Sequence, residues 1–547
     1  MTRLDRRTLL AGAALAPLLA CTRSELPSYS GGWVGANAER GHRLRDRKAA
    51  GVPAPEFTRR AGAIVVGAGV SGLAAARELA RAGIDDVQLL DLENEPGGNS
   101  RGHRIAGMRC PLGAHYLPVP GERASEVIEL LDELKLRRVE HGRVVYDERA
   151  LCHTPQERLF IDGAWREGLL PPVDALPAGE RAATLAQYRA FSARVAQLAG
   201  GGDAFAMPTA RSVWSSALSA LDAQTFAAWL DAAGFTAPAL RWYLDYCCRD
   251  DYGAGAAQVS AWAGIHYFAS RHGFRAPGRD EGGDGGDSGV LTWPEGNAWL
   301  AERMAAPLAG RIATGLVVLR VDEEREAVVV DAWNTAAARL ERWICPQVVL
   351  ATPLFVAKRL LATANAALSE AVSRLPQSPW LVANLHLDTP LDDRPGAPPS
   401  WDNVLYGSRA LGYVDDQHQS LRPFAGPTVL TVYWALGGNS AAELSAGRAA
   451  LLGEGWASWA ARVVADVATA HPDLPARVRR VDLTRYGHAM SVPVPGLRSS
   501  AALQSLAAPQ RRVQFAHADL SAYSVFEEAI YHGTRAGRAA AAGLAAG

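Results

Sequence analysis

Glycines at a fixed spacing near the start of the chain could hold the phosphates of a dinucleotide. Gly67, Gly69 and Gly72 form a Gly-x-Gly-x-x-Gly motif between an apolar run, 63–66, and a helix-like segment, 70–82. The first glycine of such a motif permits a tight turn, and the second lets the pyrophosphate approach the backbone. The third lets the helix pack closely on the strand, with the phosphates at the positive helix N-terminus. The residues predicted to line this turn are Gly67, Gly69, Val70, Ser71 and Gly72.

An acid follows at the distance that ribose recognition requires. Asp91 ends a second predicted strand, 87–92, about 20 residues after Gly72, and Glu93 is an alternative. Strand, glycine turn, helix and acid together predict a dinucleotide-binding βαβ unit in which Asp91 contacts the adenosine ribose.

Further motifs follow along the chain as far as the last helix. They are Pro96-Gly-Gly-Asn-Ser-Arg101, Gly113-Ala-His-Tyr116, Pro294-Glu-Gly-Asn297, Gly315-Leu-Val-Val318, Val349-Leu-Ala-Thr-Pro353, Tyr486-Gly-His-Ala-Met490, Phe515-Ala-His-Ala-Asp519 and Val525-Phe-Glu-Glu-Ala529. In type and order they resemble the flavin-containing amine oxidase superfamily, which includes polyamine and monoamine oxidases, protoporphyrinogen oxidase and phytoene desaturases. The resemblance implies FAD as the cofactor, held by Gly97, Gly98, Asn99, Arg101, Gly113, Ala114, Val318, Asp519, Val525 and Phe526 in addition to the first glycine turn.

Two positions depart from that family's cofactor pattern. Asn99 stands where the family has an arginine that meets phosphate, and Arg101 is the alternative for this role. The closing Ala-Gly-Glu is replaced by Ala-His-Ala-Asp, so Asp519 is a shifted equivalent of the family's acid. The chain shows no Cys or His in a pattern of covalent flavin attachment, so we expect non-covalent FAD.

The substrate side departs further. The resemblance implies hydride transfer to the flavin N5, near which the family's amine oxidases keep a lysine; here the strand 380–387 offers Asn384 and His386 instead. Histidines can act as bases near neutral pH, and carboxylates and aromatic faces attract ammonium groups. The candidate catalytic residues are therefore His488, His517 and Asn384, and the candidate substrate-binding residues are His115, Tyr116, Asp251 and Tyr486.

Three classes of function fit these residues. The first is oxidation of a small, polyamine-like amine, and the second is desaturation or dehydrogenation of a non-amine substrate with an acceptor other than oxygen. The third is a flavin-binding module without turnover in a membrane assembly. In the first two classes the partner is a small-molecule substrate, and the electron acceptor is oxygen or another compound.

The N-terminus is typical of an export signal. Arg6 and Arg7 precede an apolar run, 9–20, which ends at Cys21. As a helix, twelve apolar residues reach about 18 Å, less than the bilayer core of about 30 Å. The segment resembles a twin-arginine signal with a bacterial lipobox, in which Cys21 is lipidated. We expect a lipid anchor on the periplasmic side of a bacterial membrane, the outer membrane if the cell is Gram-negative.

Composition excludes several partners. A net charge of −1 over 547 residues predicts no nucleic-acid binding. After Cys21 the chain has five cysteines, an odd number without regular spacing, so we expect no disulfide framework. No Cys or His stands at metal-ligand spacing, and we predict no metal.

These observations predict an α/β fold with a two-lobed, Rossmann-like FAD-binding domain assembled from discontinuous segments, and a substrate domain made of a mixed sheet and helices. The expected divisions are a signal peptide (1–21), a tether (22–61), FAD-binding segments (62–135, 291–365 and 481–547) and substrate-domain segments (136–290 and 366–480). We expect helices over 176–264 and 525–546, a surface loop over 278–289, and strands at 316–321, 327–331, 348–351, 380–387, 428–434 and 513–516.

Overall fold

The computed structural model describes residues 29–50, 53–174, 176–200, 203–271, 273–277, 289–422 and 425–546. The predicted signal peptide with Cys21, and the predicted loop 278–289 apart from its last residue, lie outside these ranges.

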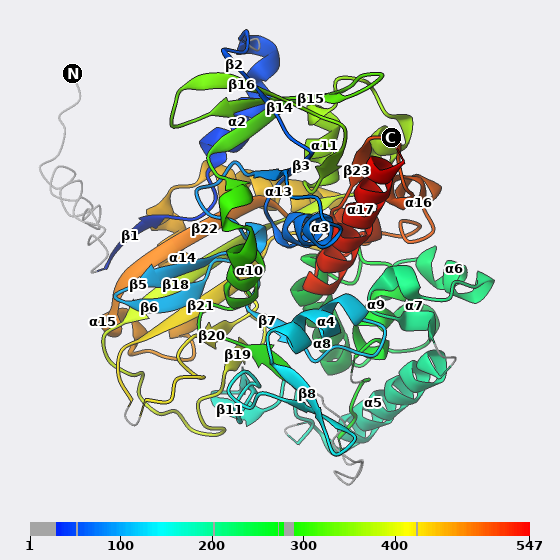
Figure 1. Ribbon diagram of the computed structural model, residues 1–547. Helices are drawn as coiled ribbons and strands as arrows, with labels where there is room; N and C mark the ends of the chain where they lie inside the picture. Colours follow the sequence, from blue (N-terminus) through cyan, green and yellow to red (C-terminus); the bar gives the residue numbers. More distant parts are fainter. Residues whose placement is uncertain are drawn as a thin grey trace, which may run out of the picture.

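Within the described ranges, a parallel sheet of five strands carries the first glycine motif. Its order is β13 (Ile312–Ala313), β4 (Val87–Leu90), β3 (Ala63–Val66), β17 (Val348–Leu350) and β23 (Val513–Phe515). The three central strands are apolar and almost entirely buried, as expected for a parallel sheet covered on both faces. Helix α3 (Val70–Arg81) follows β3, and the last helix, α17 (Phe526–Ala545), lies beside it (Figure 1).

Glycines set the close approach of these two helices. A Cβ atom on Gly533 would lie 2.1 Å from the Ser71 carbonyl oxygen, and one on Gly537 would lie 2.6 Å from that of Ala75. Larger residues at these two positions would push α17 away from α3 and from the glycine turn that precedes α3.

A second, smaller sheet lies over the same domain. In the described chain it contains β14 (Leu316–Glu323), β15 (Val328–Asn334), β16 (Arg339–Cys345) and β2 (Phe57–Arg60). The inward residues of β14 and β15 form one hydrophobic core with Ile64, Val66 and Leu350 of the parallel sheet. This arrangement places Val318, which is 6% exposed, at the carboxyl side of the nucleotide fold.

A mixed sheet forms the base of the other lobe. Its order in the described residues is β1 (Ser30–Trp33), β22 (Val478–Ser491), β18 (Gln377–Leu387), β21 (Thr428–Ala435), β20 (Tyr413–Asp415), β19 (Asp402–Leu405), β10 (Glu157–Ile161) and β11 (Ala164–Glu167). One face packs on α14 (Trp456–Ala468) through Leu381, Ala383 and Leu385. Trp380 and Val382, on the opposite face, join the core of the helical lobe. Helices therefore pack against both faces of this sheet (Figure 1).

Helices build the rest of this lobe. They are α5 (Ala178–Ala199), α6 (Ser216–Asp222), α7 (Phe226–Ala232), α8 (Pro238–Tyr252) and α9 (Ala261–Ala269). Phe191 of α5 contacts the rings of Phe226, Phe235, Phe268 and Phe274. This aromatic core fixes α8 and α9, which carry the residues discussed below.

The remaining elements connect the lobes or cover their edges. They are α2 (Ala38–Ala50), β5 (Gly102–Ile105), β6 (Met108–Pro111), β7 (Tyr116–Pro118), α4 (Ser125–Glu133), β8 (Arg137–Glu140), β9 (Arg143–Tyr146), β12 (Val290–Thr292), α10 (Ala298–Ala305), α11 (Leu354–Leu360), α12 (Ala366–Arg374), α13 (Ala441–Gly453), α15 (Leu474–Arg477) and α16 (Ala501–Ala507). No helix in the part of the chain that the structure describes is long and apolar enough to span a bilayer.

The predicted tether, 22–61, is largely folded where it is described, which corrects that prediction. β1 pairs in parallel with β22, from Ser30 opposite Arg480 to Trp33 opposite Leu483. β2 pairs in parallel with β16, and α2 lies between them in the chain. These strands are short and polar, so no alternation of apolar and polar residues marks them in the sequence. They are stabilised by partner strands far away in the sequence. The predicted αβ architecture itself is confirmed.

Candidate active site

The glycine turn after β3 leaves room for a ligand at one position only. A Cβ on Gly67, whose φ is +97°, would lie 2.7 Å from the Ala351 carbonyl oxygen, and one on Gly72 would lie 1.8 Å from that of Gly67. These two glycines are required by the fold. A Cβ on Gly69 would meet only Gly98, at an ordinary 3.7 Å, so Gly69 is not needed for packing. The space beside Gly69 fits a pyrophosphate.

The acid at the end of β4 supports this turn. The Asp91 carboxylate accepts hydrogen bonds from the backbone N–H groups of Ala68, at 2.6 Å, and Glu93, at 2.8 Å. It lies at the carboxyl end of a central parallel strand, as predicted for the ribose-binding acid. Each oxygen keeps a lone pair with which it can accept a hydroxyl.

The second glycine loop lies against the first. Gly97 donates its N–H to the Ala68 carbonyl, and the Cα of Gly98 faces Gly69. Asn99 donates to the Ala489 carbonyl at 2.9 Å, which joins this loop to the end of β22. Arg101 donates to the Gly98 carbonyl at 3.0 Å and lies 3.4 Å from the Glu93 carboxylate. Both candidates for the phosphate contact therefore already support the loop, and their roles stay predictions.

Both helices that flank the turn present uncapped N-termini. Within the described residues no side chain caps α3 after Gly69 or α17 after Val525. The backbone N–H groups of a first turn carry partial positive charge and bind anions or carbonyl oxygens when no side chain satisfies them. These termini, with the space at Gly69, fit a flavin dinucleotide.

Asp519 holds the closing segment in place. Its buried carboxylate accepts hydrogen bonds from the Leu354 N–H at 2.9 Å and from the Gln377 amide at 3.2 Å. Burial alone would raise the pKa of Asp519, but the adjacent His517 and these donors lower it below its ordinary value. His517 Nδ1 lies 3.1 Å from the Asp519 backbone nitrogen and 3.3 Å from its carboxylate. The predicted cofactor acid and the predicted catalytic His517 thus interact with each other.

Six consecutive carbonyl groups between the lobes, from Pro111 to Tyr116, all accept hydrogen bonds. In chain order the donors are Asn384 Nδ2 (3.0 Å), Tyr486 Oη (2.9 Å), Tyr433 Oη (3.0 Å), the Asn297 N–H (3.0 Å), Thr292 Oγ1 (2.9 Å) and Asn297 Nδ2 (2.8 Å). Asn384 is fully buried and also donates to Thr431 Oγ1. Asn384 and Tyr486, predicted to be catalytic and substrate-binding, therefore position the segment that holds Gly113, Ala114 and His115.

Aromatic rings surround the end of this segment. The His115 ring stacks on Tyr433 with centroids 4.3 Å apart, and it also contacts Tyr116 and Trp401. Burial lowers the pKa of His115 to about 3, so this imidazole is neutral and too weak a base to act near neutral pH.

His488 lies apart from that aromatic group. Its exposed ring packs on Phe355 of α11, with centroids 4.7 Å apart. Burial lowers the pKa of His488 to about 4, and the charges of Arg448 and Arg359 add to this shift. We therefore expect no proton transfer by His488 near neutral pH.

Three carboxylates that form no ion pair in the described chain lie near one another in the second lobe; we call Glu157, Asp250 and Asp402 the carboxylate cluster. Arg271 and Arg249 are close enough to Asp250 for their charges to lower its pKa. Glu157 and Asp402 are direct partners on the parallel strands β10 and β19. Burial raises the pKa of Asp402 well above its ordinary value, and the charges of Asp250 and Glu157 raise it further. Burial likewise raises the pKa of Glu157 and, together with Asp251, that of Asp250 to about 7. Groups perturbed in this way by burial and by like charges are typical of functional sites.

The neighbouring Asp251 has a different role. Its carboxylate forms an ion pair with Arg271, at 3.1 Å, and accepts a hydrogen bond from Tyr523. Asp251 is therefore satisfied within the protein, whereas Asp250 has no ion pair or side-chain hydrogen bond in the described part of the chain. The sequence singled out Asp251 as a substrate residue; on this geometry Asp250 is the carboxylate that is free to bind a cation.

The cluster is partly accessible to water: Asp250 and Asp402 are half-buried and Glu157 is exposed. Desolvation by the surrounding protein nevertheless raises the pKa of all three carboxyl groups. Tyrosines surround it: burial and the charge of Asp250 raise the pKa of Tyr116, Tyr243, Tyr246 and Tyr267 well above the ordinary value. Such walls of aromatic rings and carboxylates attract ammonium groups.

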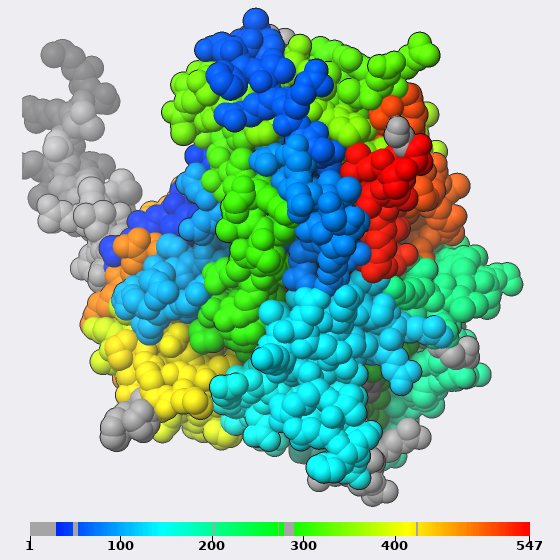
Figure 2. Space-filling view, in the orientation of Figure 1, coloured from blue at the N-terminus to red at the C-terminus, as the bar shows by residue number. Residues whose placement is uncertain are grey.

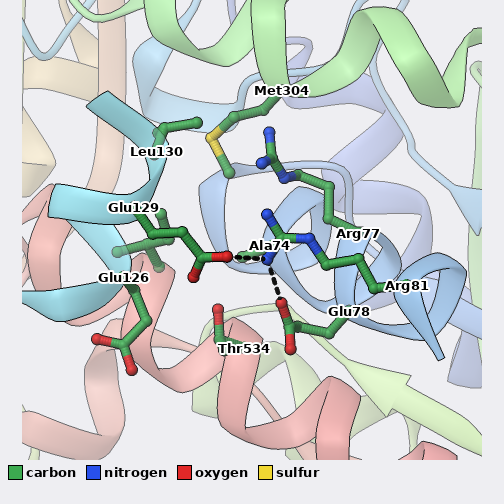
Figure 3. Close-up of a pocket in the computed structure, with 10 residues that line it drawn as sticks. Ala74, Arg77, Glu78, Arg81, Glu126, Glu129, Leu130, Met304 and Thr534 are labelled. Carbon is green, nitrogen blue, oxygen red and sulfur yellow. Dashed lines mark hydrogen bonds and ion pairs between the residues drawn. The ribbon is translucent and has the colours of Figure 1, made fainter. Parts of the chain in front are cut away.

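The small pocket drawn in Figure 3 is not part of this site. It lies between α3, α4 and α17 and holds about 10 Å³, which is space for one water at most. Arg81 fills it with ion pairs to Glu78, at 2.7 Å, and Glu129, at 3.0 Å. The pair with Glu129 joins α3 to α4.

Fold and site together define a flavoenzyme with a dinucleotide cradle in one lobe and a group of carboxylates and aromatic rings in the other. Residues 70–541 match the family described as flavin containing amine oxidoreductase, and the chain belongs to this family. It is an FAD-dependent oxidoreductase, as the motifs predict.

Similar proteins include polyamine oxidases of two plants. Polyamine oxidase 7 of Oryza sativa subsp. japonica is 31% identical over 106 residues, which are 18% of this chain and 22% of that protein. Polyamine oxidase 1 of Zea mays is 38% identical over 76 residues, 14% of this chain and 15% of that protein. The matched stretches thus span only a small part of these relatives.

Solved structures share the fold over nearly the whole chain. Wild-type putrescine oxidase bound to putrescine aligns with a TM-score of 0.60 at 17% identity, covering 88% of this chain and 99% of that one. Cyclohexylamine oxidase from Brevibacterium oxydans IH-35A gives 0.62 at 18%, covering 89% and 99%. A CLA-producing fatty acid isomerase from P. acnes gives 0.58 at 15%, covering 87% and 97%. At these identities the likeness concerns the fold alone.

Proposed function

We propose that this enzyme oxidises a small amine that carries more than one positive charge, of the polyamine kind. The observation behind the proposal is the carboxylate cluster, in which Glu157 and Asp402 face each other across β10 and β19. Like charges directly opposite each other destabilise a sheet. A bound ammonium group would offset that cost, and the surrounding tyrosines would contribute cation–π attraction.

The reacting nitrogen of an amine must lose its proton before a C–H bond can be oxidised, because its lone pair assists the reaction. FAD, when bound, supplies the acceptor for the hydride. Asp250, with a pKa raised to about 7, is partly ionised at neutral pH and suits the role of proton acceptor. Glu157 and Asp402 would then hold the distal ammonium group, and the carbonyl-bonded segment 111–116 would keep His115 and Tyr116 in place.

The alternative is a desaturase or dehydrogenase that acts on a non-amine substrate and uses an acceptor other than oxygen. One observation favours it. Lys135 is exposed just after the end of α4 and Lys358 is exposed on α11, so neither supplies the lysine near flavin N5 that amine oxidases of the family keep. The third lysine of the chain, Lys48, lies in α2. A non-catalytic flavin module is the remaining possibility.

Anaerobic reduction separates these functions. The purified yellow protein would be mixed with spermidine, putrescine or simple monoamines without oxygen, and flavin absorbance would be followed. We expect the polyamines to bleach the flavin. If no amine bleaches it, the amine proposal fails; bleaching by other organic compounds would then support the dehydrogenase, and resistance to all of them the non-catalytic module.

We further propose that the enzyme is exported and held at the periplasmic side of a bacterial membrane by lipid on Cys21. The support is the sequence alone: Arg6 and Arg7, the apolar run and the lipobox-like end. Cys21→Ala should release the protein from the membrane fraction, and Arg6→Lys with Arg7→Lys should stop export. Wild-type protein found in the cytoplasm would contradict the proposal.

A further inference from the structure

A second cavity lies away from the carboxylate cluster, on the outer flank of α17. It holds about 330 Å³ and is bounded by α16, α17, Ser521 and Ala210. The segments meet where the red helix α17 borders the orange α16 and the green helical lobe (Figure 2). This volume lies at the lower end of the range of small-molecule sites.

The cavity carries positive charge. Arg498 and Arg535 line it, and none of the described lining residues is acidic. Arg535 donates to the carbonyls of Ala507 and Phe515, and Arg498 donates to that of Thr209. Neither guanidinium has an ion pair in the described part of the chain, and burial lowers the pKa of both. The charges of Glu528 and Asp222 partly offset this shift for Arg498, whereas no described carboxylate does so for Arg535. Because buried charges are normally paired, Arg535 lacks a counter-ion.

Capping of α16 explains only part of this charge. Arg535 does bond Ala507, the last residue of α16, where a cation interacts favourably with the helix dipole. Arg498 precedes α16, donates to the Thr209 carbonyl and lies over the rings of Trp214 and Trp262, so it caps no helix end. It also lines the cavity.

The remaining walls determine the shape of a ligand. Leu497, Leu503 and Leu520 are buried beneath the cavity, and the Tyr531 ring forms a further side. His532 adds no charge, because burial lowers its pKa and its Nε2 bonds the Ser521 hydroxyl at 2.7 Å. Two cations beside apolar and aromatic walls suit an anionic head on a short apolar body.

We propose that this cavity binds a small organic anion, such as a carboxylate with a short aliphatic chain. The site shares no residue with the carboxylate cluster, so it stands whether or not the enzyme acts on amines. A carboxylate would sit between Arg498 and Arg535, where hydrogen bonds to charged donors are strongest.

Isothermal titration calorimetry of the FAD-loaded protein tests the proposal, with hexanoate, inorganic phosphate and the neutral hexanol as probes. We expect one saturable site for hexanoate, weaker binding of phosphate and no saturable binding of hexanol. No saturable heat with hexanoate would overturn the proposal. So would equal binding of hexanol, which would mark an apolar pocket, or binding of phosphate alone, which would mark an inorganic-ion site.

Two exposed positions on α16 provide a matched pair of variants. Gln504 lines the cavity and its side chain forms no hydrogen bond in the described part of the chain, whereas Ser505 is adjacent, exposed and outside the lining. A carboxylate placed within the cavity should weaken hexanoate binding about tenfold, so Gln504→Glu should show this loss. Ser505→Glu adds the same charge outside and should change the affinity less than about twofold. Equal effects of the two variants would show a general surface-charge effect and overturn the site.

Discussion

Glu157 and Asp402 stand directly opposite each other on neighbouring parallel strands, and no cation lies between them in the described structure. A like-charged pair in this position weakens a sheet, and the third carboxylate, Asp250, increases the cost. Enzymes tolerate such an arrangement where a ligand supplies the missing charge. The carboxylate cluster is therefore the part of the substrate region on which the proposed amine specificity depends.

The cofactor cradle predicts a separation between folding and FAD binding. Gly69 has φ of −71° and free space at its Cβ, so Gly69→Val should fold but block the pyrophosphate. We expect FAD affinity to fall at least about tenfold. Gly72→Val is the contrasting variant, because its Cβ would overlap the Gly67 carbonyl and the protein should not fold. The measurement is flavin absorbance per chain, with circular dichroism for folding; a yellow Gly69→Val protein would contradict the placement of the pyrophosphate.

The wild-type protein should release its FAD on acid precipitation. The motifs show no residue for covalent attachment, so the supernatant should be yellow and the pellet colourless. A pellet that retains the flavin would contradict non-covalent binding.

The adjacent aspartates of α8 should respond differently to removal of charge. Asp251→Asn breaks a buried pair with Arg271, whose side chains are 4% and 11% exposed, and should cost about 3 kcal/mol of unfolding free energy. Asp250→Asn breaks no pair and removes a charge that burial disfavours, so the variant should be more stable than the wild type at and above neutral pH. The kcat for a diamine should fall about 100-fold, because Asp250 is the proposed proton acceptor. Urea unfolding measures the stability of the two variants, and steady-state kinetics measures their activity. A loss of stability in Asp250→Asn but not in Asp251→Asn would contradict the geometry.

The free carboxyl of Asp250 also predicts how stability changes with pH. Its pKa rises from 3.8 to about 7 on folding, so the folded state holds the proton more tightly than the unfolded one. This group therefore favours folding at low pH, and that contribution is lost as pH rises through this window. As pH rises from 3.8 to about 7, the midpoint of thermal unfolding should fall less in Asp250→Asn than in the wild type. Spermidine should raise the midpoint more at the upper end of the window than at the lower; a pH-independent gain would contradict binding at ionised carboxylates.

Tyr486 should act as a positioning residue. Tyr486→Phe leaves the Leu112 carbonyl without its donor, which should cost about 1 kcal/mol. Tyr406→Phe is the control, because Tyr406 is exposed and its hydroxyl has no hydrogen bond in the described structure. Chemical unfolding measures both variants; equal stability of the two would contradict the role of the carbonyl bonds in segment 111–116.

Much of the fold follows from local sequence patterns. The glycine turn, α3, the central strands and α17 are predicted nearly to the residue, because buried parallel strands and amphipathic helices have a clear period. The fourteen-residue β22 (Val478–Ser491) and the pairing of β1 and β2 were not predicted. Apolar and polar residues alternate only weakly in these strands, and their partner strands lie hundreds of residues away. Only the assembled sheets therefore stabilise them.

The site was predictable in its cofactor half and only partly in its substrate half. Motif spacing places Gly69, Asp91 and the start of α17 in one cradle. The pairing of Glu157 with Asp402 joins residues from strands that no local pattern connects, and Asp250 is distinguished from Asp251 only by the distant Arg271 and Tyr523. Contacts between remote segments are what a single sequence does not reveal.

The most direct test of the proposed function compares a diamine with a monoamine of the same chain length. Anaerobic stopped-flow measurement of flavin reduction gives the half-saturating concentrations of putrescine and butylamine. With the distal ammonium held by Glu157 and Asp402, putrescine should half-saturate the wild type at a concentration at least about tenfold lower. In the double variant Glu157→Gln, Asp402→Asn this ratio should approach one, with FAD content unchanged. Equal half-saturation in the wild type, or a ratio unaffected by the double variant, would contradict the role of the carboxylate cluster.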